Sequence, residues 1–235
     1  QTMMVSTLFP GRRIPVFSSD SKMMRVLAVA ACAALQAAAA DDDGLLVRTA
    51  AGPVKGVLRT ERGGVKVWRG IPYAAPPVGD LRFRPPEAHP GWNGVRDASD
   101  FGPSCLQPGC WNSENITRMG EDCLTINVVA PKLAKKSAVV VYFHAGEFHC
   151  GSSNDAESNW PQLVKDDIVF VSFNYRVGPF GYLGADELRS RDPRGGTGNY
   201  GMLDQRFAIK WVKDNIAAFG GDPSRITIAG ESCGG

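Results

Sequence analysis

Hydrophobic residues along the chain gather in short runs bounded by polar, glycine- or proline-containing segments. Four of these runs are nearly continuous and rich in β-branched and aromatic side chains: residues 124–129, 139–143, 168–173 and 226–229. Strands that are buried on both faces of a sheet have this pattern, which is typical of parallel sheets. We therefore expect the four runs to form a central, mostly parallel sheet.

A helix is predicted between the last two of these runs. Its apolar positions recur at helical spacing: Leu203, Phe207, Trp211, Val212, Ile216 and Phe219. Its charged positions occupy the opposite face: Asp204, Arg206, Lys210, Lys213 and Asp214. Gly220 supplies a helix C-cap and Pro223 a stop. Strand, helix and strand in this order predict an α/β fold.

The segment before the sheet is less regular. Residues 45–49 and 54–58 are short apolar runs around a turn at 51–53, which predicts a hairpin. Residues 65–71 predict a further strand that is interrupted at Arg69 and Gly70. Residues 72–109 are rich in proline and glycine, so we expect neither a regular helix nor a central strand there.

The last residues of the chain form a sequence pattern that is associated with catalysis. The last strand run leads into Gly230-Glu231-Ser232-Cys233-Gly234, a Gly-x-Ser-x-Gly sequence. In this context the pattern predicts a nucleophile elbow, a strained strand-to-helix turn that presents a serine hydroxyl above the sheet. Only residues without a Cβ fit cheaply on either side of such a turn. Ser232 is the candidate nucleophile, and the alternative is an ordinary serine in a glycine turn.

Composition narrows the class of protein. The 235 residues are 43% hydrophobic and 21% charged, which is ordinary for a globular domain. With 26 basic and 24 acidic side chains the net charge is +2, and no basic stripe suggests nucleic acid as a partner. We find no metal-ligand cluster, and the glycine-rich residues 195–201 lack the lysine and spacing of a phosphate loop. No metal and no cofactor are therefore expected.

The first 40 residues predict a targeting segment. Residues 1–22 form an upstream or disordered segment, and residues 23–40 contain a basic start, a short apolar stretch and a final alanine run. This is the pattern of a secretory signal peptide with cleavage near Ala40, and its apolar stretch is too short to span a membrane comfortably. The alternative is an alanine-rich extension. We expect residues 41–235 to be the N-terminal part of one domain in a secreted protein.

Cysteine usage fits the secretory route. Cys105, Cys110, Cys123, Cys150 and Cys233 follow the predicted signal peptide, and their odd number leaves at least one thiol free or paired with another chain. Asn115 lies in an Asn-x-Thr sequon, which predicts N-glycosylation in a secreted protein.

Several ordered motifs together resemble the carboxylesterase and cholinesterase family (type-B carboxylesterases) of α/β-hydrolases, from about residue 45 onward. The motifs are residues 69–79 with 82–83, 121–128, 174–178, 198–206, and 219–223 leading into 230–234. The resemblance implies an α/β-hydrolase fold, with a central mostly parallel sheet and flanking helices, truncated here at the elbow.

The resemblance also implies an oxyanion hole formed by the backbone amides of Gly146, Glu147 and Cys233. The family commonly has His-Gly-Gly-Gly in the corresponding loop, whereas this chain has His144-Ala145-Gly146-Glu147. Alanine and glutamate favour negative φ, so we expect an altered loop geometry. The Glu147 carboxylate would also disfavour an oxyanion unless its side chain turns away or is paired.

Two neighbours of Ser232 have open interpretations. Cys233, where the family usually has alanine, is interpreted as a small buried side chain, and the rival is a nucleophile or a disulfide partner. Glu231 is interpreted as a supporting residue of the site, and the alternative is an exposed elbow residue.

Other motif residues have architectural roles by resemblance. Arg82 is expected to pair with Glu121, and Arg176 with Asp204. A disulfide is expected between Cys105 and Cys123. Trp111 lies within that loop, where cholinesterases place a cation-binding tryptophan. The length of the loop does not let Trp111 be aligned with that residue, so a cation–π role is left open.

The predicted function is a secreted serine hydrolase that cleaves small-molecule or lipid carboxylic esters through an acyl-enzyme at Ser232. In the family's order the acid and the histidine of the triad follow the serine, so both are expected downstream of Gly235. His89, His144 and His149 are interpreted as structural or exposed. The 235-residue chain is therefore expected to be inactive by itself. The alternative function is a non-catalytic, cholinesterase-like adhesion or binding protein.

Overall fold

A computed structural model describes residues 43–60, 64–109, 118–154, 164 and 166–235. The predicted signal peptide, Trp111 and the sequon at Asn115 lie outside the described residues. In the part of the chain that is described, no helix has the length and apolar character needed to cross a membrane.

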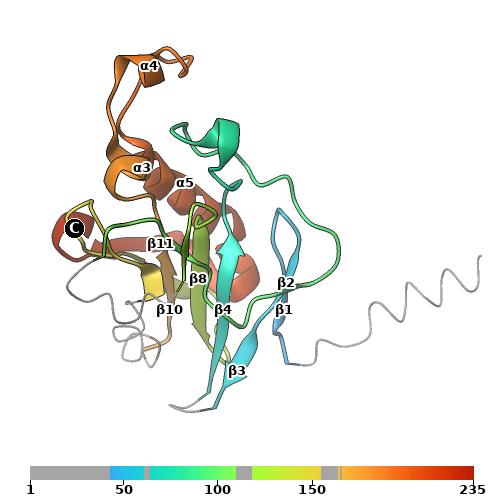
Figure 1. Cartoon of the computed structure of the whole chain (residues 1–235). Coiled ribbons are helices and arrows are strands. Elements are labelled where there is room, and N and C mark those ends of the chain that lie inside the picture. The colour runs from blue at the N-terminus through green and yellow to red at the C-terminus, as the bar shows by residue number, and fades with distance from the viewer. Residues whose placement is uncertain (1–42, 61–63, 110–117, 155–163, 165) are drawn as a thin grey trace, which may run out of the picture. The chain divides into compact units, whose positions relative to one another are not determined.

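A six-stranded sheet organises the described residues (Figure 1). Its strands, in spatial order, are β11 (Gly221–Gly230), β9 (Ser137–Phe143), β10 (Ile168–Phe173), β8 (Thr125–Pro131), β4 (Val65–Pro72) and β3 (Val57–Arg59). All four predicted central strands are present. β11, β9 and β10 run parallel, whereas β8 is antiparallel to both β10 and β4.

The expectation of a parallel strand at residues 124–129 is thus wrong in direction. β8 is buried along nearly its whole length, like β10. Its apolar run reflects burial on both faces, which core packing imposes on a central strand of either direction. The sheet of this chain is accordingly mixed.

The predicted hairpin is also present, with β1 (Leu46–Arg48) antiparallel to β2 (Pro53–Lys55). Two-residue strands β5 (Arg96–Asp97), β6 (Ser104–Cys105) and β7 (Met119–Gly120) complete two small sheets. The expected interruption of β4 is a register shift between Trp68 and Ile71. Gly70 has φ 63° there and donates its amide to Asn127 Oδ1 at 2.9 Å.

Helical segments are few. They are η1 (Gly79–Leu81), α3 (Gly178–Tyr182), α4 (Asp186–Arg189), α5 (Tyr200–Asn215), η4 (Ile216–Phe219) and η5 (Ser232–Gly234). α5 and η4 pack Ala208, Trp211, Val212, Ile216 and Phe219 into the main core with the sheet. Gly220 ends this segment in the left-handed conformation, with φ 89°, as a C-cap glycine does.

The buried face of α5 differs from the predicted one. Leu203 and Phe207 are only half-buried, and Asp204, expected on the charged face, is fully buried. Arg176 compensates the carboxylate with two hydrogen bonds, Nε to Oδ2 at 2.8 Å and Nη2 to Oδ1 at 2.7 Å. Helical periodicity alone predicts that a charged residue lies on the solvent face. Asp204 is buried instead because Arg176 neutralises its charge.

Burial raises the pKa of the Asp204 carboxyl, and the Arg176 guanidinium acts against that rise. The amide of Arg176 adds a third hydrogen bond to Asp204 Oδ2, at 3.1 Å. Arg176 Nη2 also donates to the carbonyl of Arg84 at 2.8 Å. The pair therefore joins three segments that are distant in the sequence.

We expect Asp204→Ala to destabilise the protein by about 3–5 kcal/mol, because it leaves the Arg176 guanidinium buried without its counter-charge. Urea unfolding followed by circular dichroism measures the change. The matched control is Asp214→Ala, which breaks the exposed Lys210–Asp214 pair on the same helix and should cost less than about 1 kcal/mol. Equal losses for the two variants would contradict the structural role of the buried pair.

Candidate active site

The turn after β11 has the geometry of a nucleophile elbow. Ser232 follows the strand with φ 53°, a left-handed conformation that is uncommon for a residue with a Cβ. A Cβ on Gly230 would meet the Gly234 carbonyl oxygen at 2.0 Å, and one on Gly234 would meet the Phe143 carbonyl oxygen at 2.4 Å. Both flanking positions thus require glycine, as the crowding argument predicts.

Within the described part of the chain Ser232 and Glu231 are exposed to solvent. β11 lies at the edge of the described sheet, and its Ile228 is 61% exposed. No described side chain forms a hydrogen bond with the Ser232 hydroxyl. The Glu231 carboxylate accepts a hydrogen bond from the Tyr142 hydroxyl at 3.1 Å, which links the residue before the serine to β9.

The loop after β9 lies against this elbow. β9 and β11 are parallel neighbours with Phe143 opposite Gly230, so the segments that follow them emerge side by side. The Phe148 amide donates to Cys233 Sγ at 3.3 Å. The structure therefore brings the residues expected to form the oxyanion hole, Gly146, Glu147 and Cys233, into one small region.

The loop reaches this position with unusual backbone angles. Gly146 has φ 127°, Glu147 has φ 55° and Phe148 has φ 61°. Glu147 lies in the left-handed region although glutamate favours negative φ, so the loop holds this residue in a conformation that glycine adopts more easily. Its side chain is exposed to solvent, which moves the carboxylate into a medium that screens it.

Two amides of the loop are available to a ligand. Within the described ranges neither the Gly146 nor the Glu147 amide donates a hydrogen bond to another protein atom. The Gly146 carbonyl, by contrast, accepts from the amides of His149 and Cys150 at 2.8 and 3.0 Å. Unpaired amides beside an exposed serine could bind an oxyanion.

Three tyrosine and phenylalanine side chains near the site are not predicted by the motif. They are Tyr142, Phe148 and Tyr175. The Tyr175 hydroxyl donates to the His144 carbonyl at 2.7 Å, and burial raises the pKa of Tyr175, with a further contribution from nearby Cys233. Their contacts join residues far apart in the sequence, so the spacing along the chain does not reveal them, although Tyr175 lies within the motif at residues 174–178.

The histidines do not act on Ser232 in this structure. His144 is buried, its ring stacks on Tyr175 at 4.1 Å, and its Nδ1 contacts the Ala145 carbonyl at 2.8 Å. A carbonyl oxygen only accepts, so Nδ1 carries the proton. His89 lies edge-on to Trp92, and burial lowers its pKa, with Arg96 adding to the effect. His149 is exposed.

The cysteines are divided between bonded and free. Cys105 and Cys123 form a disulfide, and Cys150 is also disulfide-bonded. Cys233 is a free thiol and is partly exposed, not buried as interpreted from the sequence. In the described part of the chain, His, Cys, Asp and Glu side chains nowhere gather in threes that could hold a metal ion.

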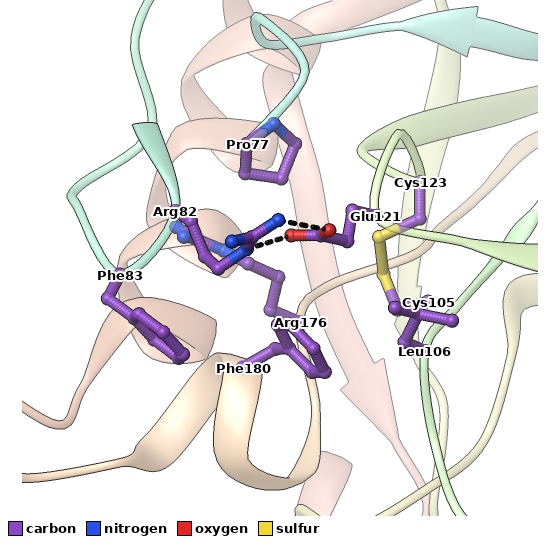
Figure 2. A pocket seen from close by; sticks show the side chains of 9 residues that line it. All are labelled: Pro77, Arg82, Phe83, Cys105, Leu106, Glu121, Cys123, Arg176 and Phe180. Carbon is purple, nitrogen blue, oxygen red and sulfur yellow. Dashed lines mark hydrogen bonds and ion pairs between the residues drawn. A yellow bond between two sulfur atoms is a disulfide. The ribbon is translucent and has the colours of Figure 1, made fainter. Parts of the chain in front are cut away.

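A small cavity lies beside the Cys105–Cys123 disulfide (Figure 2). Its volume is about 10 Å³, and the Arg82–Glu121 ion pair crosses it with Nη2 to Oε1 at 2.6 Å. The rings of Phe83 and Phe180 stack at 5.9 Å on its wall. This space admits a water molecule at most. In the described part of the chain this cavity is too small to hold an ester molecule.

We expect His144 to make the stability of the protein fall as the pH decreases. Burial lowers the pKa of His144 to about 4, so between that value and 6.5 the unfolded chain binds the proton and the folded chain does not. The free energy of unfolding should therefore drop by about 2 kcal/mol from about pH 7.5 to about pH 5. His144→Gln removes this component, whereas His149→Gln, at an exposed position, keeps it. Urea midpoints at both pH values test this, and an unchanged slope in His144→Gln would contradict it.

Comparison with known proteins places these features in a family. The family model described as "Carboxylesterase family" matches residues 43–235. The fumonisin B1 esterase of Sphingopyxis macrogoltabida is 40% identical over 225 residues, covering 94% of this chain and 41% of that protein. The para-nitrobenzyl esterase of Bacillus subtilis (strain 168) is 42% identical over 195 residues, covering 81% and 38%.

Solved structures agree with the sequence matches. A PNB esterase structure aligns with a TM-score of 0.74 at 39% identity, covering 81% of this chain and 39% of that chain. The carboxylesterase EST55 of Geobacillus stearothermophilus aligns with a TM-score of 0.71 at 42% identity, covering 81% and 38%. The chain thus spans about two fifths of the length of these relatives, and its sheet is part of an α/β-hydrolase fold. The family model, the relatives and the shared fold together establish that this chain belongs to the carboxylesterase family.

Proposed function

We propose that the full-length protein is a serine hydrolase that cleaves carboxylic esters through an acyl-enzyme at Ser232. One observation carries the proposal: Ser232 sits at a strained turn at the carboxyl end of β11, beside a loop with unpaired amides at Gly146 and Glu147. A hydroxyl held in this way can attack a carbonyl whose oxygen reaches those amides.

The proposed division of roles follows from this arrangement. Ser232 attacks the ester carbonyl, and the amides of Gly146, Glu147 and Cys233 bind the oxyanion that develops. Backbone donors survive a change of side chain, so Ala145 and Glu147 do not by themselves remove them. Glu231 supports the elbow through its hydrogen bond with Tyr142. The leaving alcohol departs, and water then releases the acid from the acyl-enzyme.

Ser232 needs a general base to take its proton. His144 is unsuitable because it is buried, its Nδ1 contacts the Ala145 carbonyl and its ring stacks on Tyr175, so no hydrogen bond joins it to Ser232 in the described structure. Burial also lowers the pKa of His144 to about 4, which makes it a weak base. We propose that the triad acid and histidine lie downstream of Gly235, in the order that is usual for α/β-hydrolases. The 235-residue chain alone should then show no ester turnover.

The names of the relatives suggest the class of substrate. They include a fumonisin B1 esterase, a para-nitrobenzyl esterase and a phenmedipham hydrolase from Pseudarthrobacter oxydans, which is 42% identical over 197 residues. We propose a small-molecule or lipid ester as the substrate.

A non-catalytic binding protein is the second candidate. The observation that favours it is Glu147, which places a carboxylate-bearing residue in the loop where an anion must bind. In the described part of the chain the Glu147 side chain is exposed to solvent, and a screened carboxylate repels an oxyanion less.

Covalent labelling separates the two candidates. We expect an organophosphate ester to modify the folded full-length protein once, at Ser232, and to abolish hydrolysis of p-nitrophenyl acetate, because such reagents capture an activated serine. Ser232→Ala should lose both labelling and turnover, whereas Ser190→Ala, at an exposed position, should keep both. Mass spectrometry locates the adduct. A folded protein that is not labelled would favour the binding function.

We further propose that the protein is secreted, with cleavage of its signal peptide near Ala40 and N-glycosylation at Asn115. Expression in a eukaryotic secretory host should yield a product that begins near Asp41 by N-terminal sequencing. Peptide N-glycosidase treatment should lower its mass, and Asn115→Gln should abolish that shift while Asn93→Gln, outside any sequon, keeps it. Retention of residues 23–40 in the exported product would contradict the signal peptide.

A further inference from the structure

The loop from His144 to Cys150 holds two consecutive non-glycine residues in the left-handed region, Glu147 at φ 55° and Phe148 at φ 61°. Residues with a Cβ adopt this conformation at a cost, and they keep it only where surrounding contacts enforce it. The loop must keep it, because the Gly146 and Glu147 amides are the proposed oxyanion donors. Because neither residue is a glycine, a contact with another part of the chain must stabilise the left-handed backbone conformation.

Both the amide and the carbonyl of Phe148 form hydrogen bonds with other parts of the chain. Its carbonyl accepts a hydrogen bond from the Gly178 amide at 2.7 Å, which ties it to the start of α3. Its amide donates to Cys233 Sγ at 3.3 Å, a distance suited to a sulfur acceptor. Its ring packs on Tyr182 with the centroids 5.2 Å apart. The sulfur of Cys233 is thus the acceptor that links this loop to the elbow.

The link acts on the oxyanion donors through covalent geometry. The amide between Glu147 and Phe148 is planar, so a hydrogen bond to its N–H fixes the orientation of the whole peptide unit. The Glu147 amide belongs to the preceding peptide unit, between Gly146 and Glu147. The left-handed φ of Glu147 helps to set the orientation of that unit relative to the Glu147–Phe148 unit. The Phe148 amide is occupied by sulfur, whereas the Gly146 and Glu147 amides have no protein acceptor in the described part of the chain and remain available to an oxyanion.

We propose that Cys233 is a positioning residue: its side-chain sulfur holds the Glu147–Phe148 peptide, and through it aims the amides that stabilise the oxyanion. This inference rests on the proposed esterase function and deepens it. Cys233 thereby serves the site twice, with its backbone amide toward the oxyanion and its sulfur toward the loop. Neither role requires the thiol to react with substrate.

The test compares Cys233→Ala with Cys233→Ser in the full-length protein, using p-nitrophenyl acetate. Alanine leaves the Phe148 amide without an acceptor, and serine keeps one. We expect Cys233→Ala to lower kcat about 10-fold with KM changed less than about twofold, since the lost interaction matters in the transition state. Cys233→Ser should retain kcat within about threefold.

A double-mutant cycle adds a readout that simple destabilisation would not produce. Glu147→Gly allows the loop to adopt its left-handed turn without enforcement, so the loss on Cys233→Ala should shrink to about twofold in that background. Equal losses in the two backgrounds would overturn the proposal. So would an unchanged kcat in Cys233→Ala, or a kcat in Cys233→Ser as low as that of Cys233→Ala.

Organophosphate labelling distinguishes failure of this inference from failure of the proposed function. A wild-type protein that is neither labelled nor active overturns both. A wild-type protein that is labelled and active, with variants that contradict the pattern above, overturns the role of Cys233 alone. Far-UV circular dichroism and melting curves of each variant show whether a loss of kcat accompanies a loss of fold.

Discussion

The parallel pairing of β9 with β11 is the constraint on which the candidate site depends. Because both strands run in one direction and end level with each other, the segments after Phe143 and after Gly230 must emerge at the same edge of the sheet. These two segments therefore lie very close to each other. The Phe143 carbonyl oxygen lies where a side chain on Gly234 would be, so the approach is closed to any residue larger than glycine. Nucleophile and loop therefore meet because the strands pair.

A site built in this way is made mainly of backbone. The donors that face a possible oxyanion are amides, and the turn that presents Ser232 is enforced by crowding around Gly230 and Gly234. Side chains add contacts around this backbone: the Tyr175 hydroxyl donates to the His144 carbonyl, and the Tyr142 hydroxyl donates to the Glu231 carboxylate. In the proposed site Glu147 contributes its amide, and in the described part of the chain its carboxylate lies in solvent.

The sequence predicts those features that depend on neighbours along the chain. Apolar runs identify the four main strands, and glycine patterns identify the elbow, the interruption of β4 at Gly70 and the cap at Gly220. Strand direction cannot be obtained in this way, because the burial that makes β8 apolar is the same for either direction. Contacts such as Phe148 to Cys233 join residues 85 positions apart, and no local pattern specifies them.

The buried Asp204 shows how such a long-range contact reaches the site. Helical periodicity assigns it to solvent, yet its pairing with Arg176 is what the motif resemblance implies. An apolar pair of the same volume could stabilise the core as well, but without directional bonds. Arg176 lies two residues before Gly178, whose amide holds the Phe148 carbonyl, and the opposite side of Phe148 is held by Cys233. The ion pair thus anchors one end of a continuous series of contacts that ends beside Ser232. The directional hydrogen bonds of the ion pair fix the position of Arg176 and of the segment that follows it. A site made of oriented amides requires such fixed positions.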